Sequence, residues 1–227
     1  MEQNQTNQYN PEYIEKWNSY FDLANNVLKN KLGITNQDDL EVKSAEITFG
    51  KLTELYLDPI QGNFDQEHLK AIHRYLFDEL YDWAGEYRIV SMRRDNQSTY
   101  FCTPERIPEL LKIEINELNK KVARAHSKIE LATALGEGYV NIQNVHPFRE
   151  GNSRTIREYF RQYVLEKTPL LPMGPMELDL TAMDPKIMVT ARTFIAAKSP
   201  GEIIMEFYKA LKPVTLTETE EIKSEVL

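Results

Sequence analysis

Apolar residues recur every three or four positions along most of this chain, and this spacing most limits the folds open to it. Such a period places apolar side chains on one face of an α-helix. It predicts helices over residues 13–33, 39–57, 65–85, 105–123, 128–144, 153–166, 176–196 and 200–211. We therefore expect a mainly α-helical protein whose core forms between amphipathic faces.

One segment departs from the helical period. Residues 87–91 and 99–102 are short runs of β-favouring residues on either side of a polar stretch. This pattern is typical of a β-hairpin. The expected fold is a helical bundle with one β-hairpin.

Length and composition favour a single domain. The chain has 227 residues, 41% hydrophobic and 27% charged, which suits one substantial core. Residues 1–12 are rich in Asn and Gln and residues 213–227 are acidic, so we expect flexible tails around a domain of residues 13–212. No export signal or membrane span is recognisable, so we expect a cytoplasmic protein, with delivery by a specialised secretion system left open.

Charge and cysteine content narrow the possible ligands. The formal net charge of −8 argues against direct nucleic-acid binding, so a phosphate ligand would have to meet a local basic site. The single cysteine, Cys102, excludes an internal disulfide, and we interpret it as a small apolar residue. His68 and His73 are five residues apart in one predicted helix, on different faces, and we interpret both as structural or surface residues.

Residues 146–157, HPFREGNSRTIR, concentrate groups that can bind and activate a charged ligand. Pro147 ends the preceding helix and presents His146 at a chain reversal. Gly151 permits a backbone conformation that side chains forbid and lets main-chain N–H groups approach a ligand. The next helix begins at this loop, where unpaired amides and the helix dipole favour an anion.

Charged side chains complete this candidate site. Arg154 and Arg157 lie on neighbouring turns of one helix face, and two guanidiniums suit a polyphosphate. Glu150 supplies the single carboxylate that often holds Mg²⁺ beside phosphate oxygens. Taken singly, these residues also fit surface ion pairs. Their combination with a potential base, His146, predicts nucleotidyl or phosphoryl transfer.

Residues 146–157 closely resemble the signature of Fic proteins, His-Pro-Phe-x-(Asp/Glu)-Gly-Asn-Gly-Arg-x-x-Arg. Residues 64–88 resemble the helix and Trp-Ala-Gly turn that precede the family's flap hairpin, and residues 30–55 resemble the start of the domain. The similarity covers residues 13–212. It implies a Fic fold and transfer of AMP from ATP to a Tyr, Thr or Ser hydroxyl of a protein, with Mg²⁺ as cofactor and with self-modification.

The resemblance also implies a role for each residue of the signature. His146 would be the general base, Glu150 would hold Mg²⁺, and Phe148 would anchor the loop. The ATP phosphates would be bound by Gly151, Asn152, Ser153, Arg154 and Arg157. The flap, defined as residues 87–102, would receive the target protein along Ile89, Val90, Ser91, Thr99, Tyr100 and Phe101.

Ser153 replaces the second glycine of the signature. Serine is a good N-cap residue, and we expect ATP to bind in the orientation for AMP transfer because serine retains the amide. The related Doc kinases have Ala-Asn-Lys here and transfer the γ-phosphoryl group. The alternatives are therefore a Doc-like kinase, or a nucleotide-binding regulatory module of a toxin–antitoxin pair without turnover.

Many Fic proteins are inhibited by a helix with the motif (Ser/Thr)-x-x-x-Glu-(Gly/Asn), whose Glu pairs with the second signature arginine, here Arg157. Residues 133–138 match the motif but lie in the helix leading to the signature, so we interpret the match as accidental. Residues 44–48 lack the Glu, and residues 217–221 are followed by Ile222. A C-terminal inhibitory helix, a separate antitoxin and a homo-oligomer all stay open.

Overall fold

The computed structural model describes residues 10–94, 100–191 and 200–214. Its helices are α1 Pro11–Ser19, α2 Gln37–Leu57, α3 Gln66–Phe77, α4 Ile107–Val122, α5 Lys128–Val145, α6 Asn152–Lys167, α7 Pro185–Thr190 and α8 Gly201–Ala210. Short 3₁₀ turns lie at Pro104–Arg106, Thr168–Leu170 and Leu180–Ala182. The strands are β1 Phe21–Asp22, β2 Val27–Leu28, β3 Met176–Leu178 and β4 Leu211–Pro213.

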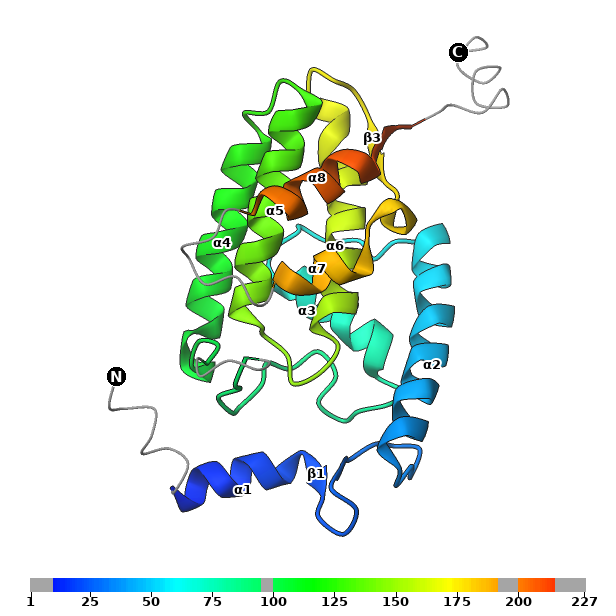
Figure 1. Cartoon of the computed structure of the whole chain (residues 1–227), viewed down its shortest axis with the longest axis vertical. Coiled ribbons are helices and arrows are strands. Elements are labelled where there is room, and N and C mark those ends of the chain that lie inside the picture. Colours follow the sequence, from blue (N-terminus) through cyan, green and yellow to red (C-terminus); the bar gives the residue numbers. More distant parts are fainter. Residues whose placement is uncertain (1–9, 95–99, 192–199, 215–227) are drawn as a thin grey trace.

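The core forms around α5 and α6 (Figure 1). Helix α5 packs against α4, α6 and α8, while α6 also packs against α3 and α2 packs against α3. Helix α5 is buried along most of its length, and its C-terminal end leads directly to the N-terminus of α6 through residues 146–151. The candidate site therefore lies in a short connection between the two central helices.

Polar side chains cap the N-termini of two of the predicted helices. Asn36 accepts from the Asp39 N–H at the start of α2, and Asp65 accepts from Glu67 and His68 at the start of α3. The predicted helices over residues 39–57, 105–123, 128–144, 153–166 and 200–211 are confirmed, with ends displaced by a few residues. The predicted helix over residues 65–85 is wrong beyond Phe77, where α3 ends and turns follow.

The predicted helix over residues 13–33 is wrong beyond Ser19. The chain forms α1 and then the antiparallel pair β1–β2, in which Phe21 pairs with Leu28. Asp22 makes the turn by accepting hydrogen bonds from the Ala24 N–H and the Asn25 side chain, and Asn26 adopts a left-handed φ of 54°. Helix α1 starts at Pro11, inside the expected tail of residues 1–12.

The predicted helix over residues 176–196 is also wrong in its first half. Strand β3 pairs antiparallel with β4, and α7 begins only after Asp184, whose side chain accepts from the Lys186 N–H. The positions alternate, with Met176 and Leu178 buried and the residue between them half-buried, so the local period is that of a strand. Pro213 belongs to β4, so the fold continues into the expected tail, of which residues 215–227 lie outside the described residues.

The flap has less regular pairing than the sequence predicts. Its described residues form one antiparallel bridge, Arg93 with Tyr100, and the Phe101 N–H donates to the Met92 carbonyl. The pairing thus starts beyond residues 87–91, where strand was expected. Val90 is buried, whereas Ile89 is 48% exposed. Thr99, one of the predicted docking residues, lies outside the described residues. None of the helices formed by described residues has the length and apolar composition needed to cross a bilayer.

Candidate active site

His146 stands where α5 ends. Its backbone is left-handed, with φ 52° and ψ 64°, and it caps the helix before Pro147 turns the chain away. This is the chain reversal expected from Pro147. The side chain is 8% exposed and borders a cavity of about 830 Å³. The imidazole is therefore held in a buried position with access to one open space.

The loop after His146 is braced by Phe148 and Asn152. Phe148 is fully buried, and its ring stacks on His73 with a centroid separation of 3.9 Å. The Asn152 carboxamide accepts from the Phe148 N–H and donates to the Phe148 carbonyl. The Asn152 side chain is thus engaged within the loop through its oxygen and one of its two N–H groups, and its main-chain N–H lies in the first turn of α6.

Gly151 is required by its conformation and by its neighbours. Its φ is 81°, and a Cβ placed there would lie 2.3 Å from Cζ of Phe77. Gly151 is also the N-cap of α6, so the unpaired amides of the first helical turn follow it immediately. Ser153 sits inside this first turn and borders the cavity, so the expectation that it serves as the N-cap is wrong.

His73 supports the loop from α3. Its Nδ1 accepts from the Gly85 N–H, and its Nε2 lies 3.0 Å from the Glu150 carbonyl oxygen, to which it donates. Burial lowers the pKa of His73 to about 3, so the ring is neutral and can fill both roles at once. His68 is buried as well and accepts from the Phe64 N–H. Both histidines are structural, as interpreted from the sequence.

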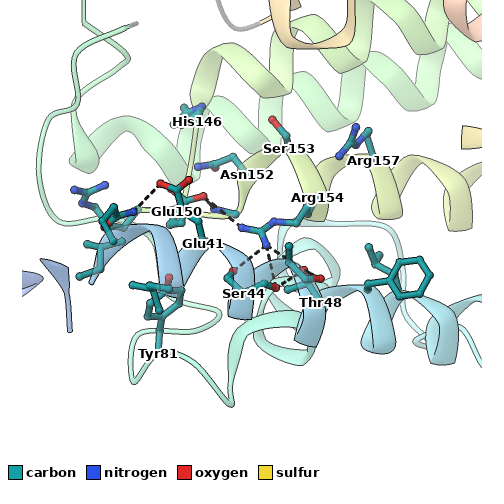
Figure 2. Close-up of a pocket in the computed structure, with 18 of the residues that line it drawn as sticks. Glu41, Ser44, Thr48, Tyr81, His146, Glu150, Asn152, Ser153, Arg154 and Arg157 are labelled. Atoms are coloured by element: carbon teal, nitrogen blue, oxygen red, sulfur yellow. Dashed lines mark hydrogen bonds and ion pairs between the residues drawn. The ribbon is translucent and has the colours of Figure 1, made fainter. Parts of the chain in front are cut away.

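Glu150 and the two arginines meet at the cavity in different ways (Figure 2). The Glu150 carboxylate accepts from the Gly151 N–H and lies 3.5 Å from Nη2 of Arg154. The Arg154 guanidinium extends to α2, whereas Arg157, one turn further along α6, points elsewhere along the cavity wall. Within the described parts of the chain, Arg157 makes no hydrogen bond or ion pair.

Helix α2 contributes side chains that sequence reasoning did not place in the site. Nη1 of Arg154 donates to the Ser44 Oγ at 2.9 Å, to the Thr48 Oγ1 at 3.0 Å and to the Ser44 carbonyl. Glu41 of the same helix also borders the cavity. The sequence signal was present only as serine and threonine four residues apart on an otherwise apolar face.

The cavity wall lowers the dielectric around its charges. Burial lowers the pKa of the Arg154 guanidinium, and the neighbouring Glu150 carboxylate acts in the opposite direction. Burial raises the pKa of Tyr81, on the same wall, to about 12, with Glu150 adding to the effect. In such surroundings an anion gains more from the arginines than it would in water.

Arg149 is a further residue that the motif alone did not single out. Its guanidinium carbon lies 5.1 Å from the Trp17 ring, 5.7 Å from the Tyr20 ring and 5.2 Å from the Phe21 ring. These three rings come from α1 and the start of the β1–β2 hairpin and form a cage over the cation. The N-terminal elements are thereby fastened to the residue next to Glu150.

The candidate inhibitory segments fall in three different places. Residues 133–138 lie within α5, as expected for an accidental match. Ser44 and Thr48 contact Arg154 from α2. Residues 217–221 are outside the part of the chain that the structure describes.

The profile of the Fic/DOC family matches residues 63–164. A probable protein adenylyltransferase of Sinorhizobium fredii, y4lH, is 31% identical over 178 residues, which are 77% of this chain and 86% of that protein. The chain therefore belongs to the Fic/DOC family.

Two further proteins resemble this chain, one in sequence and one in fold. The protein adenylyltransferase VbhT of Bartonella schoenbuchensis is 33% identical over 149 residues, 65% of this chain but only 30% of VbhT. The chain thus matches less than a third of that longer relative. The crystal structure of BepC from Bartonella tribocorum, with bound AMPPNP, superposes with a TM-score of 0.76 at 22% identity, covering 87% of this chain and 98% of BepC. At that identity the superposition shows the shared fold alone.

Proposed function

We propose that this protein transfers AMP from ATP to a Tyr, Thr or Ser hydroxyl of a protein target and releases pyrophosphate. The observation that carries the proposal is that one cavity joins His146, Glu150, the first amides of α6 and the two arginines. Relatives named as protein adenylyltransferases support the same reaction. The structure of a bound nucleotide analogue in BepC supports ATP as the substrate.

In this proposal His146 is the general base. Its imidazole takes the proton of the attacking hydroxyl as that oxygen bonds to the α-phosphorus. The bond from the α-phosphorus to the oxygen bridging to the β-phosphate breaks, and pyrophosphate leaves with that electron pair. Positioned proton transfer of this kind is typically worth about 10²–10⁴-fold in rate.

The phosphates would be bound at the N-terminus of α6. Asn152 and Ser153 would contribute main-chain N–H groups, which the helix dipole makes favourable for an anion. Gly151, whose own N–H donates to Glu150, would let the loop backbone approach the phosphates closely. Arg154 and Arg157 would bind the β- and γ-phosphates, with Arg154 already directed by its contacts with α2. The Arg154 side chain is only 24% exposed, and this burial strengthens its contact with an anion.

The residues present fit a magnesium ion. The Glu150 carboxylate is 46% exposed and faces the cavity beside the proposed phosphate site, and Mg²⁺ is usually held by one or two carboxylates together with phosphate oxygens and waters. When bound, the ion would neutralise phosphate charge and fix the orientation of the α- and β-phosphates. Glu150 would hold it, while the Gly151 N–H and Arg154 keep the carboxylate in place.

Ser153 is compatible with this assignment because the helix supplies its amide whichever side chain follows. We expect Ser153→Gly to change the rate of AMP transfer by less than about tenfold, the effect of 1.4 kcal/mol. The rate is measured with α-labelled ATP. An increase of several orders of magnitude would show that the serine side chain misplaces the nucleotide.

The target would bind along the flap. Of its described residues, Ile89 is exposed and Ser91 and Tyr100 are half-buried, and an extended segment could add to the flap by main-chain pairing. Shortening residues 92–98 should reduce protein modification more than ATP binding. Equal loss of both would contradict a docking role. We further propose that an inhibitory glutamate, from an antitoxin or from this chain's C-terminal segment, would act at Arg157.

Label transfer tests the reaction directly. Purified protein is incubated with Mg²⁺ and ATP labelled at the α- or the γ-phosphate, and self-modification serves as the readout. Label from the α-phosphate alone, lost in His146→Ala, is the expected result. Label from the γ-phosphate alone would identify a Doc-like kinase, and ATP binding without transfer to itself or to a cell extract would favour the regulatory module.

A further inference from the structure

The base of the flap is bonded to the chain on both sides of His146. Arg88 is 1% exposed, and its guanidinium donates hydrogen bonds to four main-chain carbonyl oxygens. The acceptors are the carbonyl oxygens of His146 at 2.8 Å, Val90 at 2.7 Å, Cys102 at 2.6 Å and Val145 at 3.3 Å. The Arg88 N–H also donates to the Pro147 carbonyl at 2.9 Å. One side chain thus joins both arms of the flap to the end of α5.

This arrangement meets two needs of the backbone at His146. The last carbonyls of α5 lack helical partners and carry the negative end of the helix dipole, and the last turn of α5 contains no basic residue of its own. His146 is also left-handed before a proline, a conformation that persists only where the surroundings impose it. Arg88 places a cation at the C-terminus of α5 and holds the carbonyls of Val145, His146 and Pro147 by hydrogen bonds.

The flap also touches the imidazole itself. The Phe101 ring stacks on the His146 ring with a centroid separation of 4.0 Å and an interplanar angle of 7°. The Arg94 guanidinium carbon lies 4.5 Å from the Phe101 centroid, and Arg94 donates to the Asn144 side chain in the last turn of α5. The ring that contacts the imidazole is therefore itself tied to the helix that presents His146.

We infer that the flap positions the catalytic histidine, with Arg88 fixing its main chain and Phe101 fixing its ring. Both act as positioning residues, and the inference rests on the proposed role of His146 as the general base. The flap would then have two roles, docking the target and positioning His146. A target bound along the flap would contact the same element that aligns the imidazole.

Two variants weaken the positioning contacts while keeping the charge or the apolar character of the side chain. Arg88→Lys keeps the charge, but one ammonium cannot reach carbonyls in several directions. Phe101→Leu keeps an apolar side chain but removes the flat ring. We expect the self-modification rate at saturating ATP to fall on the order of 10²-fold in Arg88→Lys and on the order of tenfold in Phe101→Leu, because small misplacements of a reacting group have such effects. The Kd of α,β-methylene-ATP, which binds without transferring AMP, should stay close to the wild-type value.

Matched controls come from elsewhere in the fold. Arg161 is a buried arginine bonded to Glu158 and the Leu55 carbonyl, and Phe64 is a buried ring whose centroid lies 4.4 Å from that of His68. Arg161→Lys and Phe64→Leu should lower stability without lowering the transfer rate in the folded protein. Equal rate losses in the control and flap variants would overturn the inference.

A second readout does not depend on turnover. In the wild type, stacking on Phe101 should shift the ring-proton NMR signal of His146 upfield, with assignment by His146→Ala. The shift should be lost in Phe101→Leu and kept in Phe64→Leu. An unchanged His146 signal in Phe101→Leu would overturn the inference even if Arg88→Lys failed to fold. Absence of AMP transfer by the wild type would refute the proposed function instead, and the NMR result would then decide the positioning alone.

Discussion

At the scale of single residues, Gly151 combines two constraints that can be separated by experiment. Alanine there must adopt a φ of 81° and place its Cβ 2.3 Å from Phe77. Gly33 has a similar φ of 68° but nothing within 4 Å of the added atom. We expect Gly151→Ala to lower the free energy of unfolding by about 2–5 kcal/mol, and Gly33→Ala by about 1–2 kcal/mol.

Urea denaturation measures both changes. Gly33→Ala serves as the control for backbone strain, since only Gly151 adds a steric clash. Equal losses in the two variants would show that the Phe77 ring moves away at little cost and that the loop is looser than its contacts indicate.

His73 gives the protein a predictable sensitivity to acid. Burial lowers its pKa to about 3 in the folded protein, against about 6.5 in the unfolded chain. As the pH falls, the unfolded chain takes up a proton on His73 before the folded protein does. The folded state is therefore fully favoured above pH 6.5, and it loses stability as the pH falls from 6.5 toward 3. Each pH unit in that window should remove about 1.4 kcal/mol from the free energy of unfolding.

The measurement compares unfolding of wild type and His73→Gln from pH 8 to pH 4. Glutamine can still donate to the Glu150 carbonyl but does not titrate, so the difference between the two curves isolates His73. A wild-type curve parallel to that of the variant below pH 6.5 would contradict a neutral, buried His73.

The residues of the motif could be found from sequence because they are contiguous and each has a distinct chemistry. Pro147 and Gly151 determine the backbone of the loop, and the structure brings His146, Glu150 and the two arginines to the wall of one cavity. Ser44 and Thr48 could not be found in this way, because their contact with Arg154 depends on how α2 packs against the core. The same is true of Arg88, whose acceptors are main-chain carbonyls and leave no trace in composition.

At the scale of elements, helices were wrongly predicted where a short sequence fits both the helical and the strand period of apolar residues. Phe21 and Leu28 can share a helix face, but they also pair across two strands once Asp22 and Asn26 make a turn between them. In residues 176–178 a strand was mistaken for the start of a helix, because three residues are too few to separate the periods. The long helices were predictable because many turns repeat the same apolar face.

The cage formed by α1 and β1 makes a prediction at this scale. Replacing Trp17 by leucine removes the nearest of the rings around Arg149, and a cation–π contact of this kind is worth about 0.5–2 kcal/mol. We expect Trp17→Leu to lower the free energy of unfolding by a similar amount and to weaken binding of α,β-methylene-ATP, because Arg149 precedes Glu150. Calorimetry measures both.

Leu23, in the turn of the neighbouring β1–β2 hairpin, offers a control. It is 68% exposed, so Leu23→Ala should leave stability and nucleotide binding near wild type. Normal nucleotide binding in Trp17→Leu would show that the N-terminal elements stabilise the fold without influencing the loop.

At the scale of the whole molecule, one hydrophobic cluster reaches from Tyr20 and Val27 near the start of the chain to Ala210 and Leu211 near the end of the described residues. The cluster includes residues of α5 and α6, the central helices in Figure 1, which flank the candidate site. Separate folding of the N-terminal elements would expose the apolar surface of that cluster to water, which is costly. We propose that the elements form one cooperative unit.

The two tryptophans can test that unity, because Trp17 reports on α1 and Trp83 on the turn before the flap. Single-tryptophan variants, Trp83→Phe and Trp17→Phe, should show urea midpoints by fluorescence that coincide with each other and with the loss of helix by circular dichroism, as cooperative unfolding requires. Phenylalanine retains an aromatic face for Arg149 in the second variant. A Trp17 signal that changes at lower urea than the helical signal would show that α1 and the β1–β2 hairpin detach first, and that the cage over Arg149 opens while the core is still folded.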